Sequence, residues 1–500
     1  MKFVFLSIFL VVSWQPFHKS GRDKHLLSRS ALYDKIKGGW TGQVIGVTYA
    51  TEVQASASRE SGIGENVQWS DGYQLSTFNS DPDAYDDVYI DLTFLEAIRE
   101  FGVEVTPKKL AESYLLATYD VNHGCRSARY NLQKGMSPQR SGYWLNNPHA
   151  DDSDFLAHAD FIGLMFPGLP QSAAQLSQKV GHLMSYGDGY YGGLYVATLY
   201  SLAFVSNSPQ NIIEEALHAI PSKSNFFQTV KYAVEQYHQY PYAWDRALAQ
   251  FQRKWSKKFG CPERLIGEED ADAKINASYI TLALLYGEGD FDKTLQIIKA
   301  MNRGDGNVAT VAGILGVMNG YEKIPVQWKQ GIDEIEALPF HHSTLSLADA
   351  CDITFRQALS MVENAKGRIT KDQIVIARQT PSPAKLERSF EGHYPKEIRN
   401  LADATLTDRL DFEFEGIGFV LRGAAPAPES DEIVLAELYL NNKYIEVVEI
   451  PLNRKHWRPE LVWKFQLPHD IYTVSLRPLK KDSTTSVKLS ELVVYDVTGD

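Results

Sequence analysis

The spacing of apolar and polar residues divides the chain into two parts. From about Leu26 to Asn364, apolar residues recur every three or four positions, which is typical of amphipathic helices. We expect helices over the following stretches: Leu32–Val47, Val88–Phe101, Phe155–Met165, Ala173–Ser185, Gly193–Val205, Tyr242–Phe259, Ala273–Tyr286, Phe291–Ala300 and Ala309–Met318. The first part of the chain is therefore predicted to be all-α.

The second part has the period of β-strands. Pro381 and Pro383 indicate a linker or a domain edge, and alternation of apolar and polar residues begins at Leu410. Strands are expected over 411–421, Ile433–Leu440, Lys443–Ile450, Leu461–Leu467, Tyr472–Leu476 and Val487–Val494. We predict a helical domain over residues 26–370, followed by an antiparallel β-sandwich over residues 385–500.

Two features within the helical part favour a functional site. The stretches Thr51–Asp83 and His123–Asp154 have no helical period, and structureless loops of this length usually serve a site. The first predicted helix also carries closely spaced glycines, which lower helix propensity: Gly38, Gly39, Gly42 and Gly46. We expect them to permit a close helix crossing or the approach of a ligand to the backbone.

Acidic residues gather at a few points, beginning with the helix predicted at Val88. Asp86 and Asp87 precede this helix, where acids commonly cap the backbone amides, and Asp91 lies one turn further on the same face. Acids that converge on one face need a cation, a proton or solvent to limit their repulsion. Glu52 follows the glycine-containing helix and is either a solvated loop acid or part of the same cluster.

Three further segments combine acids with glycine, histidine or asparagine. Asp151, Asp152 and Asp154 follow His149 and precede another predicted helix, although capping accounts for only one of them. Asp188 lies in the tyrosine- and glycine-rich turn Gly187–Gly193. Asp305 belongs to a loop that precedes a helix of small residues.

Composition limits the partners and the compartment. The net charge of -12 argues against a nucleic-acid partner, which would require a basic surface. The short apolar run Phe3–Trp14 follows a positive start, so residues 1–20 are predicted to be a signal peptide and the protein to be secreted or periplasmic. No later segment has the length and apolarity of a transmembrane span. The three cysteines have no metal-ligand spacing and are expected to be separate thiols.

The order of these motifs resembles the ADP-ribosylglycohydrolase family over Leu32 to Asn364. A glycine-rich helix ends in Glu52, an Asp-Asp pair opens a second helix, and a late Gly-Asp loop opens an alanine- and glycine-rich helix. The segments Gly187–Gly193 and Asn146–Asp152 are similar to an exported bacterial branch of that family. The resemblance implies an all-α orthogonal bundle that hydrolyses a glycosidic bond.

The resemblance also implies roles for individual residues. Asp86 and Asp87 match the metal-binding acids of the family's first motif, Asp305 matches an acid of the second motif, and Glu52 matches the acid that faces the scissile bond or the metal-bound water. Known members bind two magnesium or manganese ions. Here, Tyr85 and Val88 replace the two threonines of the first motif, and Arg303 replaces an acid of the second. Because each change removes an oxygen ligand, we expect one ion or none, with a guanidinium supplying positive charge.

We therefore expect Glu52, Asp86, Asp87 and Asp305 to form the catalytic centre. The residues expected to bind substrate are Asp151, Asp152, Asp154, Asp188, His149, Tyr190, Asn307, Arg303 and Trp144. The predicted substrate is a sugar linkage in a glycan or an ADP-ribose-like compound.

Three alternatives to this prediction remain open. The helical domain can instead be a catalytically silent glycan-binding protein. A nucleotide hydrolase would need a basic phosphate pocket, which the acid loops do not indicate. In the sandwich, the aromatic residues Trp457, Trp463 and Tyr444 can form a sugar platform, or they can pack in the core and at a domain interface.

Overall fold

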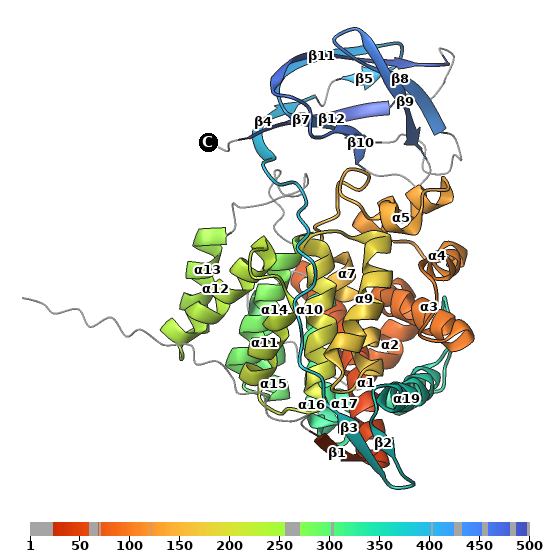
Figure 1. The fold of residues 1–500 in the computed structure, drawn as a ribbon, viewed down its shortest axis with the longest axis vertical. Coiled ribbons are helices and arrows are strands. Elements are labelled where there is room, and N and C mark those ends of the chain that lie inside the picture. Colours follow the sequence, from red (N-terminus) through yellow and green to blue (C-terminus); the bar gives the residue numbers. More distant parts are fainter. Residues whose placement is uncertain are drawn as a thin grey trace, which may run out of the picture.

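The computed structural model describes residues 24–59, 69, 72–121, 123–255, 271–301, 305–401, 404–424, 433–452, 459–480 and 487–497. Figure 1 shows a helical body with a β-sandwich stacked on the end that carries α5. Helices followed by antiparallel sheets confirm the predicted fold class. Within the described ranges, no helix is both long and apolar enough to cross a bilayer. The predicted signal peptide lies outside these ranges.

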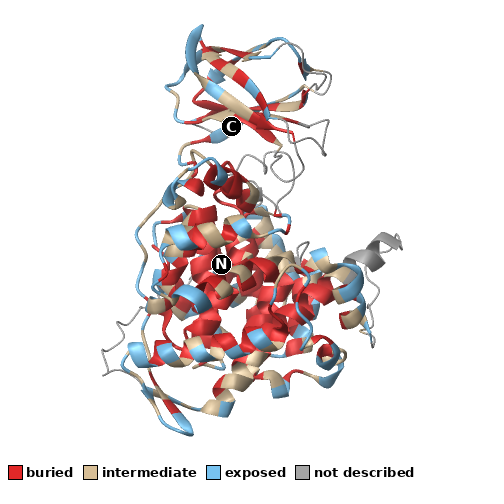
Figure 2. Ribbon diagram, turned by 90° about the vertical axis from the view of Figure 1, so that its right-hand side faces the viewer, coloured by how far each residue is buried: buried red, intermediate tan, exposed pale blue. Residues whose placement is uncertain are grey.

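The helical part is built from α-helices and short 3-10 helices around one apolar core. The α-helices are α1 (Arg29–Arg59), α2 (Tyr73–Ser80), α3 (Asp86–Phe101), α4 (Pro107–Leu116), α5 (His123–Gln133), α6 (Pro138–Ser141), α7 (Asp154–Ala157), α8 (Asp160–Met165), α9 (Pro170–Met184), α10 (Asp188–Ala203), α11 (Pro209–Ala216), α12 (Asn225–Gln239), α13 (Trp244–Trp255), α14 (Ala273–Gly287), α15 (Phe291–Met301), α16 (Asp305–Asn319), α17 (Val326–Lys329), α18 (Ile332–Ile335) and α19 (Leu347–Asn364). The 3-10 helices are η1 (Pro82–Tyr85), η2 (Leu217–Ala219) and η5 (Tyr321–Lys323). Figure 2 shows buried residues filling the centre of this body.

The glycines of α1 allow it to touch the backbone of α16. A Cβ added at Gly42 would lie 2.7 Å from the carbonyl carbon of Ala312, and one added at Gly46 would lie 2.5 Å from the Cα of Ala309. The predicted close packing is confirmed. As α1 advances by four residues, the contact on α16 moves back by three or four, so the two helices are antiparallel. The part of α1 just after Gly46 therefore lies beside the start of α16, and α1 continues beyond it to Arg59.

Both long segments predicted to be loops contain helices, so these two predictions are wrong. Helix α1 continues to Arg59, and α2 and η1 precede Asp86. In the second segment, α5 buries Cys125, Ala128 and Leu132 at helical spacing. Its period is hidden in the sequence because Arg129 is also buried, with its guanidinium 4.6 Å from the ring centre of Tyr114. The amphipathic helix α5 was therefore not predicted, because its segment is rich in polar residues.

Other predicted boundaries also shift. The helix expected over Phe155–Met165 is interrupted at His158 and Ala159, which separate α7 from α8. The turn expected over Gly187–Gly193 is largely helical, because α10 begins at Asp188. The described cysteines, Cys125 and Cys351, are buried and unpaired, as expected.

The C-terminal strands form two antiparallel sheets. The strands are β4 (Tyr394–Asn400), β5 (Thr405–Leu406), β6 (Leu410–Gly416), β7 (Gly418–Ala424), β8 (Ile433–Leu440), β9 (Lys443–Pro451), β10 (Glu460–Lys464), β11 (Asp470–Pro478) and β12 (Val487–Asp496). One sheet has the order β6-β11-β8-β9, and the other has the order β10-β7-β12-β4 with β5 also paired to β12. The prediction of a single strand over 411–421 is therefore wrong, because the chain passes from β6 in one sheet to β7 in the other at Ile417. Gly416 permits this crossing, because a Cβ there would meet the backbone carbonyl of Tyr495.

The segment between the two parts lies along the helical body. Strands β1 (Lys24–Ser28), β2 (Arg368–Ile369) and β3 (Gln373–Ala377) form a small sheet at the far end, and the chain then runs toward the sandwich (Figure 1). On this path, the amide of Gln379 donates to the carbonyl of Gly168 at 3.0 Å, and the amide of Ala384 donates to that of Ala219 at 2.9 Å. This proline-containing linker is thus bound to the helices over its length.

The sheet that contains β7 and β12 is covered on both faces. Phe419 and Leu492 point into the core between the sheets, whereas the intervening Val420 and Val493 belong to a second apolar cluster with Trp144 of the helical domain. Alternating residues of a strand point to opposite faces, so both faces here are apolar. The sandwich is therefore packed firmly against the helical domain.

Candidate active site

The starts of α3 and α16 meet at the acid pair. Asp86 and Asp87 occupy the first turn of α3 and are half-buried. A Cβ added at Gly306, the second residue of α16, would lie 2.8 Å from Oδ2 of Asp87 and 3.2 Å from Cβ of Ala157. Asp305 begins α16, and the antiparallel packing brings the part of α1 that contains Glu52 toward the same end. The side chains of Glu52 and Asp305 lie outside the described part of the structure.

His158 joins this cluster and was not anticipated from the sequence. Its Nδ1 lies 3.6 Å from Oδ1 of Asp87. Burial lowers the pKa of the His158 imidazole to about 4, despite the opposing effect of Asp154, so the ring is neutral near pH 7. The sequence predicted one continuous helix over Phe155–Met165 and so gave no reason to place His158 at the site. The break after α7 brings His158 beside Asp87.

A second pair of carboxyl groups, Asp91 of α3 and Asp160 of α8, lies in the core. Asp91 is one turn along α3 from Asp87. Oδ2 of Asp160 accepts hydrogen bonds from Nε2 of Gln43 and from the hydroxyl of Tyr200, each at 2.8 Å. Burial and the neighbouring Asp160 raise the pKa of Asp91 well above its usual value, and burial raises the pKa of Asp160 to about 7. Oδ1 of Asp91 has no hydrogen-bond partner among the described residues. We infer that Asp91 holds a proton while Asp160 carries the charge, because Asp160 accepts two hydrogen bonds at 2.8 Å, whereas Oδ1 of Asp91 accepts none from the described residues.

This assignment predicts unequal effects of two similar substitutions. Asp160→Asn should destabilise the fold by roughly 2–3 kcal/mol near pH 7, because the amide cannot accept as the carboxylate does. Asp91→Asn should change stability by less than about 1 kcal/mol, because an amide replaces a neutral group of the same shape. Urea unfolding of both variants measures the difference. Equal losses would contradict the assignment.

The raised pKa values also predict how stability depends on pH. A carboxyl group whose folded pKa exceeds its unfolded value favours folding in its protonated form. Its contribution is present below the unfolded pKa of about 4 and is lost as the pH rises toward 7. The contribution of this pair to stability should therefore fall between about pH 4 and pH 7, and the fall should be smaller in Asp91→Asn. Urea titrations at the two pH values test this, and an equal fall in both proteins would contradict it.

Two of the predicted substrate-binding acids cap helices. The carboxylate of Asp154 accepts from the amides of Gly124 and Cys125 at the start of α5, at 3.3 and 3.1 Å. Oδ1 of Asp188 accepts from the amide of Phe226 at the start of α12, at 3.0 Å. Anionic side chains at these ends stabilise the helices.

Asp151, Asp152 and His149 lie at the boundary between the helices and the sandwich. Asp151 accepts a hydrogen bond from the hydroxyl of Ser389 in the linker, and burial together with Asp188 raises its pKa to about 7. Nδ1 of His149 lies 3.0 Å from Oδ2 of Asp152, and its Nε2 lies 2.6 Å from Oε2 of Glu460 in β10. All of these groups except Ser389 are buried, and they connect the two parts of the molecule.

The remaining predicted binding residues lie mostly in the interior. Tyr190 is buried, and its ring stacks on His182 with the ring centres 4.5 Å apart. Nδ2 of Asn307 donates to Oδ1 of Asn276 at 2.5 Å. Trp144 is buried in the interface cluster. Arg303 lies outside the described residues.

The aromatic residues of the proposed sugar platform are separated. Nε1 of Trp463 donates to the carbonyl of Leu145 in the helical domain at 2.9 Å, so this residue lies at the domain interface. Tyr444 is 51% exposed. Trp457 lies outside the described residues.

The described residues do not complete the metal site that the resemblance implies. Tyr85 is buried and its hydroxyl is hydrogen-bonded to Oγ1 of Thr48 at 2.8 Å, and Val88 has no oxygen in its side chain. Neither residue can replace the threonine ligands. Over the described ranges, no group of three or more histidine, cysteine, aspartate or glutamate side chains could hold an ion. A divalent ion such as magnesium needs about six oxygen donors, so a binuclear centre does not fit this set.

Comparison with known proteins identifies one family. The sequence model described as ADP-ribosylglycohydrolase matches residues 28–360, nearly the range over which the motifs suggested it. No curated protein matches the chain significantly. A solved structure named "ADP-ribosylglycohydrolase-related protein complex" is 15% identical and covers 66% of this chain and 99% of its own, with a TM-score of 0.43.

Proposed function

Because the chain belongs to the ADP-ribosylglycohydrolase family over residues 28–360, we propose that it hydrolyses a glycosidic bond where α1, α3 and α16 meet. The observation that carries this proposal is the contact between Asp87 and Gly306, which brings the two motif-bearing helix starts together. Family membership supports glycosyl hydrolysis in general. The division of roles among the residues is our proposal.

The chemistry requires a negative charge near a developing oxocarbenium ion, an acid for the leaving oxygen and a base for water. We assign the negative charge to Asp87, since it is half-buried at a helix start, where the helix dipole favours a negative charge. Glu52 is proposed to donate a proton to the leaving oxygen or to accept one from water. The imidazole of His158 lies beside Asp87, with 3.6 Å between Nδ1 and Oδ1, and adds no positive charge because burial lowers its pKa.

For the substrate, we propose a sugar linkage in an extracellular glycan or in an ADP-ribose-like compound, with secretion directed by residues 1–20. The loss of oxygen ligands at Tyr85 and Val88 favours a second candidate: a catalytically silent glycan-binding protein on the same scaffold.

The two candidates are separated by turnover. The substrates are 4-nitrophenyl furanosides and pyranosides and an ADP-ribosylated arginine peptide, and the products are nitrophenol and ADP-ribose. Wild-type protein should release product from at least one of them, and Glu52→Gln should lower that rate about 100-fold, as expected when an acid–base group is lost. The control is Glu100→Gln, an exposed acid near the other end of α3, which should leave the rate unchanged.

Two outcomes would contradict the proposal. Equal rates for wild type and Glu52→Gln would place catalysis elsewhere. Glycan binding without turnover of any substrate would favour the silent binding protein.

The metal content is a separate prediction. Because the described donors do not complete a binuclear centre, protein equilibrated with magnesium or manganese and then desalted should retain at most one ion per chain. Elemental analysis by mass spectrometry measures this ratio. Two tightly bound ions would show that Glu52, Asp305 and solvent together restore the family's site.

A further inference from the structure

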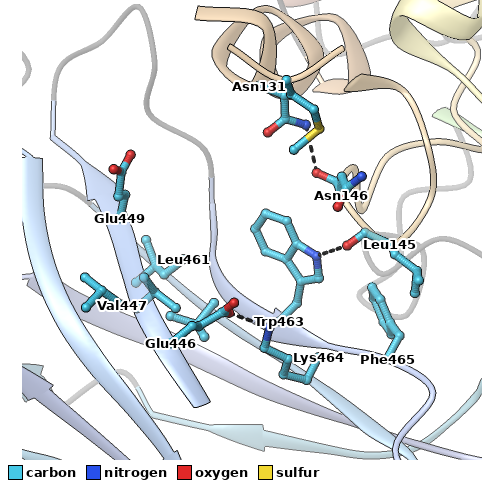
Figure 3. Close-up of a pocket in the computed structure, with 13 residues that line it drawn as sticks. Asn131, Leu145, Asn146, Glu446, Val447, Glu449, Leu461, Trp463, Lys464 and Phe465 are labelled. Atoms are coloured by element: carbon cyan, nitrogen blue, oxygen red, sulfur yellow. Dashed lines mark hydrogen bonds and ion pairs between the residues drawn. The ribbon is translucent and has the colours of Figure 1, made fainter. Parts of the chain in front are cut away.

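A cavity lies between the sandwich and the helical domain, away from the acid pair. Its volume is about 380 Å3, within the range of roughly 300–1,000 Å3 that is typical of small-molecule sites. Asn131, Leu145 and Asn146 line it from the helical side, and Val447, Leu461 and Trp463 line it from β9 and β10 (Figure 3). Neither domain forms this cavity alone.

Trp463 provides a fixed aromatic wall. Figure 3 shows its indole standing between the sandwich strands and the loop that carries Leu145 and Asn146. The indole N–H donates to the carbonyl of Leu145 at 2.9 Å, which sets the orientation of the ring, and the side chain remains half-buried. A flat ring held in this way offers an apolar face on which the C–H groups of a sugar can stack.

The charged groups around the cavity are compensated. Lys464 forms an ion pair with Glu446, and Nζ of Lys134 lies 2.7 Å from Oε2 of Glu449. The hydroxyl of Tyr130 also donates to Glu449 at 2.5 Å. A charged ligand would have to compete with these pairs, whereas a neutral ligand with many hydroxyl groups can hydrogen-bond to them without separating charge.

The helical wall of the cavity is also rigid. Nδ2 of Asn131 donates to the carbonyls of Ser141 and Asn146, both at 2.9 Å. Nδ2 of Asn146 donates in turn to the carbonyl of Arg140 at 3.0 Å. These bonds hold the polar side of the cavity opposite Trp463 before any ligand arrives, which lowers the entropic cost of binding.

From these features, we infer that the interdomain cavity binds a neutral sugar unit of a glycan, with Trp463 as its stacking face. None of its lining residues belongs to the centre at α3 and α16, so this site would hold a glycan chain without acting on it. The inference does not depend on the proposed hydrolysis, because it concerns binding alone.

The test begins with the full-length protein on a microarray of neutral oligosaccharides and matched sulfated and uronic-acid oligosaccharides. Affinity for the strongest neutral ligand is then measured by titration calorimetry. Val447→Trp places a large side chain in the cavity and should weaken binding at least 10-fold. Ile471→Trp is the matched control, because Ile471 is exposed on β11 and does not line the cavity, and it should bind as wild type does.

A second variant keeps the inference testable if Val447→Trp fails to fold. Trp463→Phe retains an aromatic ring, loses the bond to Leu145 and should weaken binding several-fold. Three results would overturn the inference: no binding to any neutral glycan, a preference for the anionic set, or Val447→Trp and Ile471→Trp affecting binding equally.

Discussion

Replacing Asp87 with asparagine is expected to lower kcat/KM for glycosidic hydrolysis about 1,000-fold, with little change in thermal stability. The substitution keeps the size of the side chain and removes only its charge. A preorganised charge that stabilises the transition state contributes roughly 100- to 1,000-fold to kcat. Asp87 is positioned for this role because its side chain is 21% exposed and lies against Gly306 at the start of α16. Steady-state kinetics on the best substrate, alongside a melting curve, gives both quantities.

Asp83 provides a matched control for this experiment. It precedes α3 by three residues, and its side chain is 87% exposed. Asp83→Asn changes the charge near the same helix start by the same amount, yet its activity should stay within about twofold of wild type, since exposed charges act weakly. If Asp87→Asn were equally active, Asp87 would only stabilise the start of α3.

The second large effect is expected at the crossing of α1 and α16. Gly42→Ala should destabilise the helical domain by about 3 kcal/mol, at the upper end of overpacking effects. In an isolated helix, the same change would stabilise by about 1 kcal/mol, so the sign of the effect distinguishes packing from propensity. The new Cβ would lie 2.7 Å from the carbonyl carbon of Ala312 and 2.9 Å from the Cα of Gly313. These are backbone atoms of a central helix and cannot move aside separately.

Gly192→Ala in α10 serves as the comparison. There, the added Cβ would lie 3.2 Å from the Cβ atoms of Ala273 and Leu156, a milder overlap that small shifts of the neighbouring helices relieve. We expect its stability to stay within about 1 kcal/mol of wild type, because the propensity gain offsets the crowding. Urea unfolding followed by circular dichroism at 222 nm reports on the helices of both variants. A stabilised Gly42→Ala protein would mean that α1 and α16 can separate at little cost.

The sequence predicted the elements whose periods are regular. Apolar spacing identified the helices that became α3, α9, α14 and α16, and alternation identified β8 with both of its ends. Helix α5 was not predicted because its buried face includes Arg129. An arginine is expected at the surface, and only the structure shows that this one packs on Tyr114. The change of sheet at Ile417 was missed because an alternating pattern does not show which neighbour a strand pairs with.

The candidate site stays a prediction, and the sequence pointed to it through motifs that lie at helix starts. The order of motifs pointed to α3 and α16, and the contact between Asp87 and Gly306 brings them together. The sequence did not indicate that His158 lies at the site, because the position of this residue depends on a break between two short helices. Conversely, Asp154 and Asp188 looked like site residues although their carboxylates cap helices that begin far away in the sequence. Capping across such distances depends on tertiary structure.

The contact between His149 and Glu460 constrains how this protein can be divided or recombined. Removing the sandwich would expose the imidazole and Asp152 to water, and it would strip the apolar cluster around Trp144 of its partners. Conversely, a sandwich grafted onto another enzyme would keep the ion pair between Glu460 and Arg422, but Oε2 of Glu460 would lose its contact with the imidazole. The two parts are therefore expected to be inherited together, with changes at one side of the contact matched by changes at the other.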